Sequence, residues 1–347
     1  MTETKQTKRI ASVTRAEGPV EAAPGIIRVG TRGSALAVSQ TTTVAQTIAR
    51  ATGLDVVLVI VTTKGDVSRA PLAQLGGTGV FVSALRDALL AGECDVAVHS
   101  LKDLPTGPCE GITLGAIPER ADARDALCAR DGLTLETLPE GALVGTGSPR
   151  RAAQLLSRRP DLQVSDLRGN VDTRLGRVAT DLDAVVLAAA GLDRIGRDAA
   201  ITERFSLDVA PPAPGQGALA IEVRSAETET GPLHDALVAL NDPAARAEAL
   251  AERALLATLE AGCAAPIGAT AVAANGELTL SATVYRLDGQ EQLTAVERSP
   301  LASPEADRDA RYRSSLTDRT AHELGASVAK QLLDQGAAEL APLGATR

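Results

Sequence analysis

The chain has 347 residues, too many for one ordinary hydrophobic core, so two or three domains are expected. Hydrophobic residues make up 44% and charged residues 23%, a composition typical of soluble globular proteins. The net charge of −9 argues against a surface that binds polyanions, and aromatic residues at 1% leave almost no material for stacking on single-stranded nucleic acid.

The first 24 residues are polar and carry charges of both signs, so they predict a disordered N-terminal tail rather than a secretion signal. No apolar stretch reaches the length of a membrane span, and no membrane association is expected. Four cysteines and three histidines show no spacing typical of a zinc site or a disulfide framework. We therefore predict no metal site and a reduced, cytoplasmic setting.

From Ile26 the pattern alternates between strand and helix, which is typical of an α/β domain with a parallel sheet. Ser34 is a candidate N-cap for the first helix. The expected strands are 26–29, 55–62 and 95–98, and the expected helices are 34–51 and 80–91. Residues 63–79 combine Gly, Pro and charge without a period, and a loop of that length is expected to be functional or disordered.

A second unit is expected to begin after Pro118 and to end at the Pro-rich crossover 210–217. Its predicted strands are 143–144, 163–165 and 184–187, and its predicted helices are 150–157 and 171–179. A strand at 218–223 and helices near 233–240 and 243–259 follow. Three strands in series and a closing helix, at 270–274, 278–286, 292–297 and 322–335, then predict a small α+β domain.

Basic residues accompany Gly, Ser or Thr at four predicted strand-to-helix junctions. A helix start with free backbone N–H groups favours anions, and arginine adds planar, paired hydrogen-bond donors. The junctions carry Arg32 and Ser34; Ser100 and Lys102; Thr146, Ser148, Arg150 and Arg151; and Arg168, Gly169 and Arg174. In an acidic protein this repetition predicts a cleft for a ligand with several carboxylates or phosphates.

Asp103 stands beside Lys102 beyond the carboxyl end of a predicted strand, where open α/β sheets bind their ligands. Its carboxylate is a candidate proton donor or acceptor, and the alternative is a charge pair on a solvated turn. The chain has no Walker A loop, no dinucleotide-binding fingerprint and no nucleophile elbow. Nucleotide-binding and hydrolase functions are accordingly disfavoured.

Cys263 follows a predicted helix at Glu260-Ala261-Gly262, in a turn that Pro266 and Gly268 close. Glycine near a helix end permits a tight turn, which would hold the thiol outside the helix face. From this segment alone two interpretations stay open. The thiol is either available for covalent chemistry or, as is common for free cysteines, a small buried hydrophobe.

At this point the sequence resembles the porphobilinogen deaminase (hydroxymethylbilane synthase) family, over most of residues 26–270 and in the expected order. The matching runs include VGTRGSALA (29–37), LAQLGGTGVF (72–81), DVAVHSLKDLP (95–105), VGTGSPRR (144–151), LRGNVDTRL (167–175), LAAAGLDRIG (187–196) and APGQGALAIEVR (213–224), with the cysteine segment. The resemblance implies two α/β domains arranged like a bilobal periplasmic binding protein, plus a C-terminal α+β domain. The implied bounds are 25–118 with 217–238, then 119–212, then 239–342.

The resemblance also implies the chemistry. Cys263 would hold a dipyrromethane cofactor through a thioether, and four porphobilinogens would add in turn with loss of ammonia before hydrolysis releases hydroxymethylbilane, a precursor of porphyrins and haem. Asp103 matches the catalytic carboxylate. Implied cofactor contacts are Lys102, Asp103, Thr146, Ser148, Arg150, Arg151, Arg168 and Gly169. Implied substrate contacts are Arg32, Ser34, Ser100, Arg174, Arg194 and Gln216. The family implies a monomer.

The physical interpretation agrees with the implied chemistry. Each pyrrole carries two carboxylates, so a six-ring chain would bring about twelve negative charges for the arginines to offset. A carboxylate such as Asp103 could stabilise the cationic azafulvene that forms as ammonia leaves. We expect residues 63–79 to act as a lid, although Gln74 and Thr78 replace lysines that the family often has there.

Two alternatives come from other classes of protein. A bilobal binding protein for polycarboxylates would explain the arginines but not Cys263 or the C-terminal domain. A cysteine-dependent acyl transferase would need a histidine partner for the thiol, and His99, His234 and His322 offer no local pairing.

Overall fold

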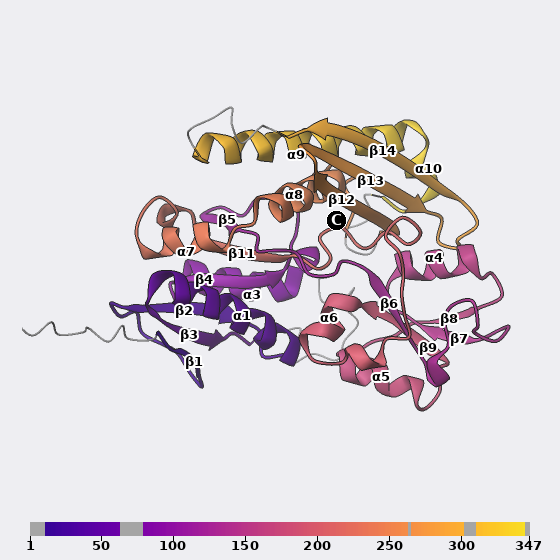
Figure 1. Ribbon diagram of the computed structural model, residues 1–347, viewed down its shortest axis with the longest axis horizontal. Helices are drawn as coiled ribbons and strands as arrows, with labels where there is room; N and C mark the ends of the chain where they lie inside the picture. Colours follow the sequence, from indigo (N-terminus) through magenta and orange to yellow (C-terminus); the bar gives the residue numbers. More distant parts are fainter. Residues whose placement is uncertain (1–10, 63–78, 263–264, 302–309, 344–347) are drawn as a thin grey trace, which may run out of the picture. The chain divides into compact units, whose positions relative to one another are not determined.

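The computed structural model describes residues 11–62, 79–262, 265–301 and 310–343, which divide into two compact units (Figure 1). The first unit contains the chain up to His99, with Pro108–Ile117 and Leu219–Asn241. The second contains Ser100–Gly107, Pro118–Ala218 and the chain from Asp242 onward. Cys263 and most of the predicted lid, including Gln74 and Thr78, lie outside the described residues.

A six-stranded sheet forms the centre of the first unit, in the order β1-β3-β2-β4-β11-β5. Its strands are β1 (Val13–Ala16), β2 (Ile26–Thr31), β3 (Asp55–Ile60), β4 (Val96–Ser100), β5 (Ile112–Ala116) and β11 (Leu219–Arg224). Its helices are α1 (Ala35–Thr52), α3 (Gly79–Leu90) and α7 (Pro232–Leu240), with the short 3₁₀ helix η5 (Ser225–Glu227). Strands β3, β2 and β4 are parallel neighbours, as the buried Val- and Ile-rich runs predicted, and β1 adds a further parallel strand next to β3.

Helices cover both faces of this sheet, because side chains alternate along each strand. Val96 and Val98 of β4 belong to the core cluster that includes residues of α1 and α7. Ala97, between them, belongs to a second cluster with Leu85 and Leu89 of α3. The sheet is thus buried on both faces, and residues that could bind a ligand are expected at the ends of its strands.

The expected disordered tail is wrong for residues 11–24. Strand β1 pairs in parallel with the outer edge of β3, and Val13 packs against the core. The backbone N–H and hydroxyl of Ser12 both donate to Asp55 Oδ1 at 2.9 Å, and Arg28 donates to the carbonyl of Val20 at 3.1 Å. The polar composition of this segment gave no indication of a strand, because the strand is stabilised by pairing with the edge of the sheet. Residues 1–10 lie outside the described part of the chain.

The second unit contains a five-stranded sheet in the order β10-β6-β9-β7-β8. Its strands are β6 (Asp125–Ala129), β7 (Leu143–Gly145), β8 (Gln163–Ser165), β9 (Ala184–Ala188) and β10 (Glu203–Arg204). Its helices are α4 (Pro149–Arg158), α5 (Val171–Val178) and α6 (Ala189–Arg194), with 3₁₀ helices η2 (Leu101–Asp103), η3 (Arg130–Gly132) and η4 (Asp198–Ala200). Leu155 of α4 packs into one core cluster, and Leu192 of α6 packs into another. This sheet, too, is covered on both faces.

The same unit contains an antiparallel sheet, β12-β13-β14, from strands β12 (Ile267–Ala274), β13 (Glu277–Tyr285) and β14 (Gln292–Pro300). Helices α8 (Pro243–Thr258), α9 (Ala310–Asp334) and α10 (Ala337–Leu340) accompany it. Helices α8 and α9 pack on each other and on the sheet (Figure 1). The predicted fold class, α/β with a C-terminal α+β part, is confirmed by the three sheets; the three-domain bounds stay a prediction.

Gly325 of α9 permits the close approach of α8. A Cβ at this position would lie 2.6 Å from the Cβ of Ala254 and closer still to the carbonyl oxygen of Ala251. Gly325→Ala is therefore expected to lower the free energy of unfolding by about 1–3 kcal/mol, measured by urea denaturation. Gly176→Ala in α5, where a Cβ would meet nothing within 4 Å, is the control and should stabilise slightly. Equal effects of the two substitutions would contradict the packing argument.

None of the helices in the described ranges has the length and apolar content of a membrane span. Within the same ranges no group of three or more His, Cys, Asp or Glu side chains is placed to hold a metal ion.

Candidate functional site

Strand β4 runs directly into the turn that carries Lys102 and Asp103. The N–H of Leu101 donates to the carbonyl of Ala218, and the N–H of Leu104 donates to the carbonyl of Leu101, each at 3.0 Å. Gly215 has φ of +76°, and a Cβ there would be tightly packed, 3.2 Å from Leu101 Cγ and 3.3 Å from the backbone nitrogen of Lys102. Close packing on the crossover thus fixes the turn and leaves Lys102 and Asp103 partly buried.

Arg150 and Arg151 begin helix α4 after the short strand β7. The Ser148 hydroxyl caps the helix by accepting from the Arg151 N–H at 3.5 Å, and the Ser148 N–H donates to the Thr146 hydroxyl at 3.3 Å. Pro149 occupies the first turn, where its missing N–H costs nothing. This start directs both arginines inward, so that only 2% of Arg150 and 7% of Arg151 are exposed.

Both arginines bind one buried carboxylate, Asp125, at the start of β6. Arg150 Nη1 donates to Asp125 Oδ2 at 2.8 Å, and Arg151 donates to Oδ1 from Nη2 at 2.6 Å and from Nε at 3.0 Å. Burial would raise the pKa of Asp125, but the two guanidinium groups outweigh it and hold that pKa well below its usual range. Asp125 was not among the site residues predicted from the sequence, although an acidic residue at the start of the apolar run DALCA indicated a buried carboxylate.

Arg150 is held by further acceptors on the protein. Its Nη1 donates to Gln154 Oε1 at 2.7 Å and to the carbonyl of Pro211 at 3.0 Å. Gln154 in turn donates to the same carbonyl at 2.8 Å and to the Tyr285 hydroxyl at 3.2 Å. The Nε of Arg150 is buried and has no hydrogen-bond partner among the described residues. A buried donor without an acceptor is costly, so this atom is a candidate contact for an anionic ligand.

Gln216 links the crossover to both parts of this cluster. Its Nε2 donates to Asp125 Oδ1 and to the carbonyl of Ala123, each at 2.8 Å. Its Oε1 accepts from Arg151 Nη2 at 3.2 Å and from Lys102 Nζ at 3.4 Å. The structure therefore brings together four of the predicted site residues, Lys102, Arg150, Arg151 and Gln216, with Asp103 adjacent to Lys102 in the turn.

Positive charge exceeds negative charge in this cluster. Burial lowers the pKa of Lys102, and the neighbouring Arg151 and Arg150 lower it further against the opposing effect of Asp103 and Asp125. Among the described residues, three basic side chains lie beside two carboxylates in this cluster, and both arginines are buried. Buried charge without compensation is unfavourable, so the cluster is suited to a ligand that brings carboxylates.

A second basic group lies around the start of α5. Arg174 Nε donates to the carbonyl of Gly169 at 2.7 Å, and the φ of +109° at Gly169 favours glycine there. Burial lowers the pKa of Arg174, and the positive charges of Arg151 and Arg168 lower it further. Arg168 is exposed and donates to Asp166 at 3.0 Å. Arg194 of α6 donates to the carbonyl of Gly217 at 2.7 Å and so lies at the crossover.

Other predicted residues lie elsewhere. Ser34 caps α1 in the first unit, as predicted, by accepting from the Ala37 N–H at 3.3 Å, and Arg32 precedes it after β2. Ser100 is the last residue of β4. Cys263 is outside the described residues, and α8 ends at Thr258, before it in the chain.

Glu252 of α8 is a second buried carboxylate that the sequence analysis missed. It accepts from Arg120 Nη1 at 2.8 Å and Nη2 at 2.9 Å, from the Gly215 N–H at 2.6 Å and from the Ala271 N–H at 2.8 Å. It thereby fixes helix α8 to the crossover and to β12. In the sequence, the available signal was an acidic residue among the Ala and Leu residues of α8. The structure buries its side chain fully.

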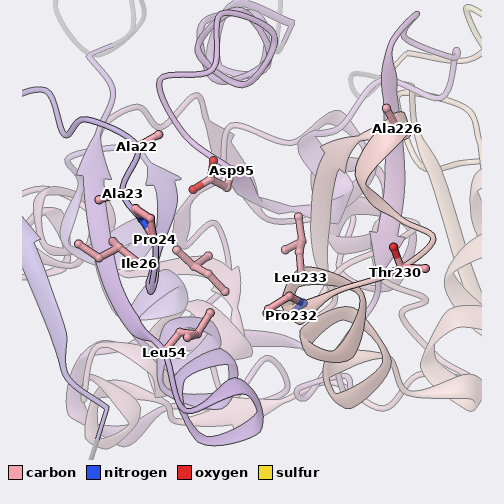
Figure 2. Close-up of a pocket in the computed structure, with 11 residues that line it drawn as sticks. Ala22, Ala23, Pro24, Ile26, Leu54, Asp95, Ala226, Thr230, Pro232 and Leu233 are labelled. Atoms are coloured by element: carbon pink, nitrogen blue, oxygen red, sulfur yellow. The ribbon is translucent and has the colours of Figure 1, made fainter.

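A groove of about 590 Å³ lies at the opposite, amino-terminal edge of the first unit's parallel strands (Figure 2). Leu54, Ile26 and Asp95 stand at the beginnings of β3, β2 and β4, and Pro232 and Leu233 of α7 form another wall. The carboxylate of Asp95 in this groove already binds Arg28 at 2.7 Å and Arg224 at 3.2 Å. The groove therefore adds nothing to the site at the turn after β4.

Glu222 of β11 forms a buried ion pair with Arg86 of α3, and its Oε2 lies 3.1 Å from His99 Nε2. Burial would raise the pKa of Glu222, but hydrogen bonds from His99 and Arg86 lower it to about 2 from an ordinary 4.5. A lowered folded-state pKa stabilises the fold above the unfolded pKa, and this stabilisation is lost as the pH falls through the folded value.

Glu222→Gln is accordingly expected to destabilise the protein at pH 7 by more than at low pH. The difference in unfolding free energy between wild type and variant should shrink as the pH falls below about 4.5, measured by urea denaturation at a series of pH values. A difference that stays constant from pH 7 to the lowest accessible pH would argue against the pairing.

The comparison with protein families shows the family to which the chain belongs. Residues 27–231 match the family model described as porphobilinogen deaminase, dipyromethane cofactor binding domain, and residues 246–334 match the porphobilinogen deaminase C-terminal domain. The chain belongs to the porphobilinogen deaminase family. The resemblance noted in the sequence is therefore confirmed, together with the dipyrromethane cofactor that defines the larger domain.

Two relatives of high sequence identity support the same assignment. The porphobilinogen deaminase of Leifsonia xyli is 60% identical over 95% of this chain and 99% of its own length. That of Cutibacterium acnes is 52% identical over 92% of this chain and 98% of its own length. Among solved structures, the methionine binding protein MetQ covers 63% of this chain and 91% of its own at 14% identity, with a TM-score of 0.40.

Proposed function

We propose that this chain is a hydroxymethylbilane synthase that condenses four porphobilinogens in turn, releasing one ammonia at each addition, and then hydrolyses off the linear tetrapyrrole. The observation that supports this most directly is the excess of buried positive charge around Lys102, Arg150 and Arg151, beside Asp103. Porphobilinogen carries an acetate and a propionate, which are the anions that such a cluster would bind.

Asp103 is proposed as the catalytic carboxylate. As the C–N bond of the aminomethyl group breaks, the amine leaves as ammonia and positive charge develops on the pyrrole of the substrate. A carboxylate held close to the pyrrole nitrogen stabilises that charge. The same group can accept the proton that is lost when the new C–C bond forms, so one residue serves all four additions.

The bound dipyrromethane group supplies a two-ring primer with a free pyrrole carbon to which the first substrate is joined. Cys263 is proposed to hold it through a thioether. Its carboxylates would be bound by Lys102, Arg150, Arg151 and Arg168, with Thr146, Ser148 and Gly169 as further contacts. The donor set fits such a group, since the buried Nε of Arg150 has no acceptor among the described residues.

Incoming substrate is proposed to be bound by Arg32, Ser34, Ser100, Arg174, Arg194 and Gln216. Burial lowers the pKa of Arg174 and of Arg194, which is the expected state of a guanidinium before a carboxylate arrives. We propose a cytoplasmic monomer that binds no nucleic acid, which size-exclusion chromatography and a nucleic-acid binding assay would check.

Two measurements on purified protein test the proposal. Incubation with porphobilinogen should release ammonia and yield uroporphyrin after oxidation of the product. The intact mass should exceed that of the polypeptide by one dipyrromethane, and Cys263→Ala should show neither the added mass nor turnover. A wild-type protein that binds porphobilinogen without releasing ammonia would instead support the binding-protein alternative.

A further inference from the structure

Arg253 of α8 contacts the turn that carries Asp103. Its Nη1 donates to the carbonyl of Leu104 at 3.0 Å, and its Nη2 donates to the carbonyl of Pro105 at 2.8 Å. These are the two residues that follow Asp103 in the chain. Both contacts lie within the second compact unit.

The local backbone explains why one guanidinium can bind two consecutive carbonyls. Pro105 fixes its own φ and restricts the residue before it to extended conformations, and Leu104 has φ of −82° and ψ of 124°. The planar fork of arginine then matches two neighbouring acceptors, which the single ammonium of lysine cannot reproduce.

The other contacts of this turn hold its upstream part. Leu101 is bound through its N–H to Ala218 and packs against Gly215, and Lys102 binds Gln216. Within the turn, the Leu104 N–H donates to the Leu101 carbonyl; Arg253 adds side-chain hydrogen bonds from another element to the backbone immediately after Asp103. Its neighbour Glu252 fixes α8 to the crossover at Gly215, so the helix that provides Arg253 is itself anchored.

From these contacts we infer that Arg253 is a positioning residue for catalysis. It fixes the position of the Asp103 carboxylate relative to helix α8, which precedes Cys263 in the chain. This inference rests on the proposed function of Asp103. The contacts of Arg253 with this turn are to backbone carbonyls, so its loss should affect the rate of chemistry more than the binding of substrate. Misplacement of a catalytic group by about 1 Å can lower a rate about 100-fold.

The test compares kcat and KM for porphobilinogen in wild type, Arg253→Ala and Arg253→Lys, each checked for the covalent cofactor by intact mass. Arg253→Ala is expected to lose about 100-fold in kcat with KM changed less than about threefold, and to keep the added mass. Arg253→Lys should lose less, because it can restore one hydrogen bond. Guanidinium ion at non-denaturing concentration should restore part of the kcat of Arg253→Ala, since Arg253 is only half-buried.

Arg246 on the same helix gives the matched control. It binds Asp318 of α9 through Nη2 at 2.8 Å. Arg246→Ala should lower the thermal midpoint while leaving kcat unchanged. The inference is overturned if Arg253→Ala keeps the wild-type kcat. It is also overturned if guanidinium ion fails to raise the kcat of Arg253→Ala and Arg246→Ala shows an equal loss of kcat. Failure of the proposed function would appear separately, as a wild type without added mass or ammonia release, and the inference would fall with it.

Discussion

Asp103→Asn is expected to lower kcat for porphobilinogen by about 100- to 10,000-fold, the usual contribution of a positioned acid or base. Asparagine keeps the shape of the side chain but removes the charge that stabilises a cationic pyrrole and the ability to accept a proton. The turn itself should persist, because it is held by the Leu101 N–H, by packing on Gly215 and by Arg253. The thermal midpoint should therefore change little.

The measurement is ammonia release in a single addition, with protein that already carries its cofactor. Asp103→Glu keeps the charge but displaces it, and should retain more activity than Asp103→Asn. Turnover of Asp103→Asn at the wild-type rate, in protein of the expected mass, would remove Asp103 from the mechanism.

The second large effect is expected at Asp125. Asp125→Asn leaves Arg150 and Arg151 buried without their carboxylate, next to Lys102. Removing one partner of a buried ion pair costs about 3–5 kcal/mol in the free energy of unfolding, because the remaining charge stays uncompensated. The exposed pair of Asp172 with Arg197 gives a control, since Asp172→Asn should cost only about 0–1 kcal/mol.

This substitution also tests the proposed role of the cluster. An acidic cofactor would replace part of the missing negative charge, so covalent loading should stabilise Asp125→Asn more than it stabilises wild type. Thermal midpoints of apo- and cofactor-loaded protein measure the difference for each. An equal gain in both would show that Arg150 and Arg151 do not face the cofactor.

Local sequence signals predicted the parts of the site that depend on neighbours in the chain. Ser34 caps its helix as predicted, Ser148 stands at a helix start as its junction indicated, and Lys102 and Asp103 follow a buried strand. Such features are set by backbone geometry over a few residues, and sequence patterns report them well.

The missed residues depend on partners far away in the chain. Asp125 binds residues 25 and 26 positions later, and Glu252 binds Arg120, 132 positions earlier. Nothing in the spacing of a single sequence identifies such pairs, and an isolated acidic residue there resembles any solvated one. Strand β1 was missed for a related reason, because its stability comes from the edge of β3 and not from its own polar sequence.

That strand protects the protein from its own copies. The segment DVVLVI of β3 is long, apolar and β-branched, and without β1 its row of backbone N–H and C=O groups would be open to any passing strand. With β1 in place, the edge strand of the sheet is the four-residue segment VTRA, which is shorter than β3 and carries a charge. A chain trimmed to the start of the matching family model, at residue 27, would lose strand β1 and should precipitate more readily, although the proposed site residues would remain.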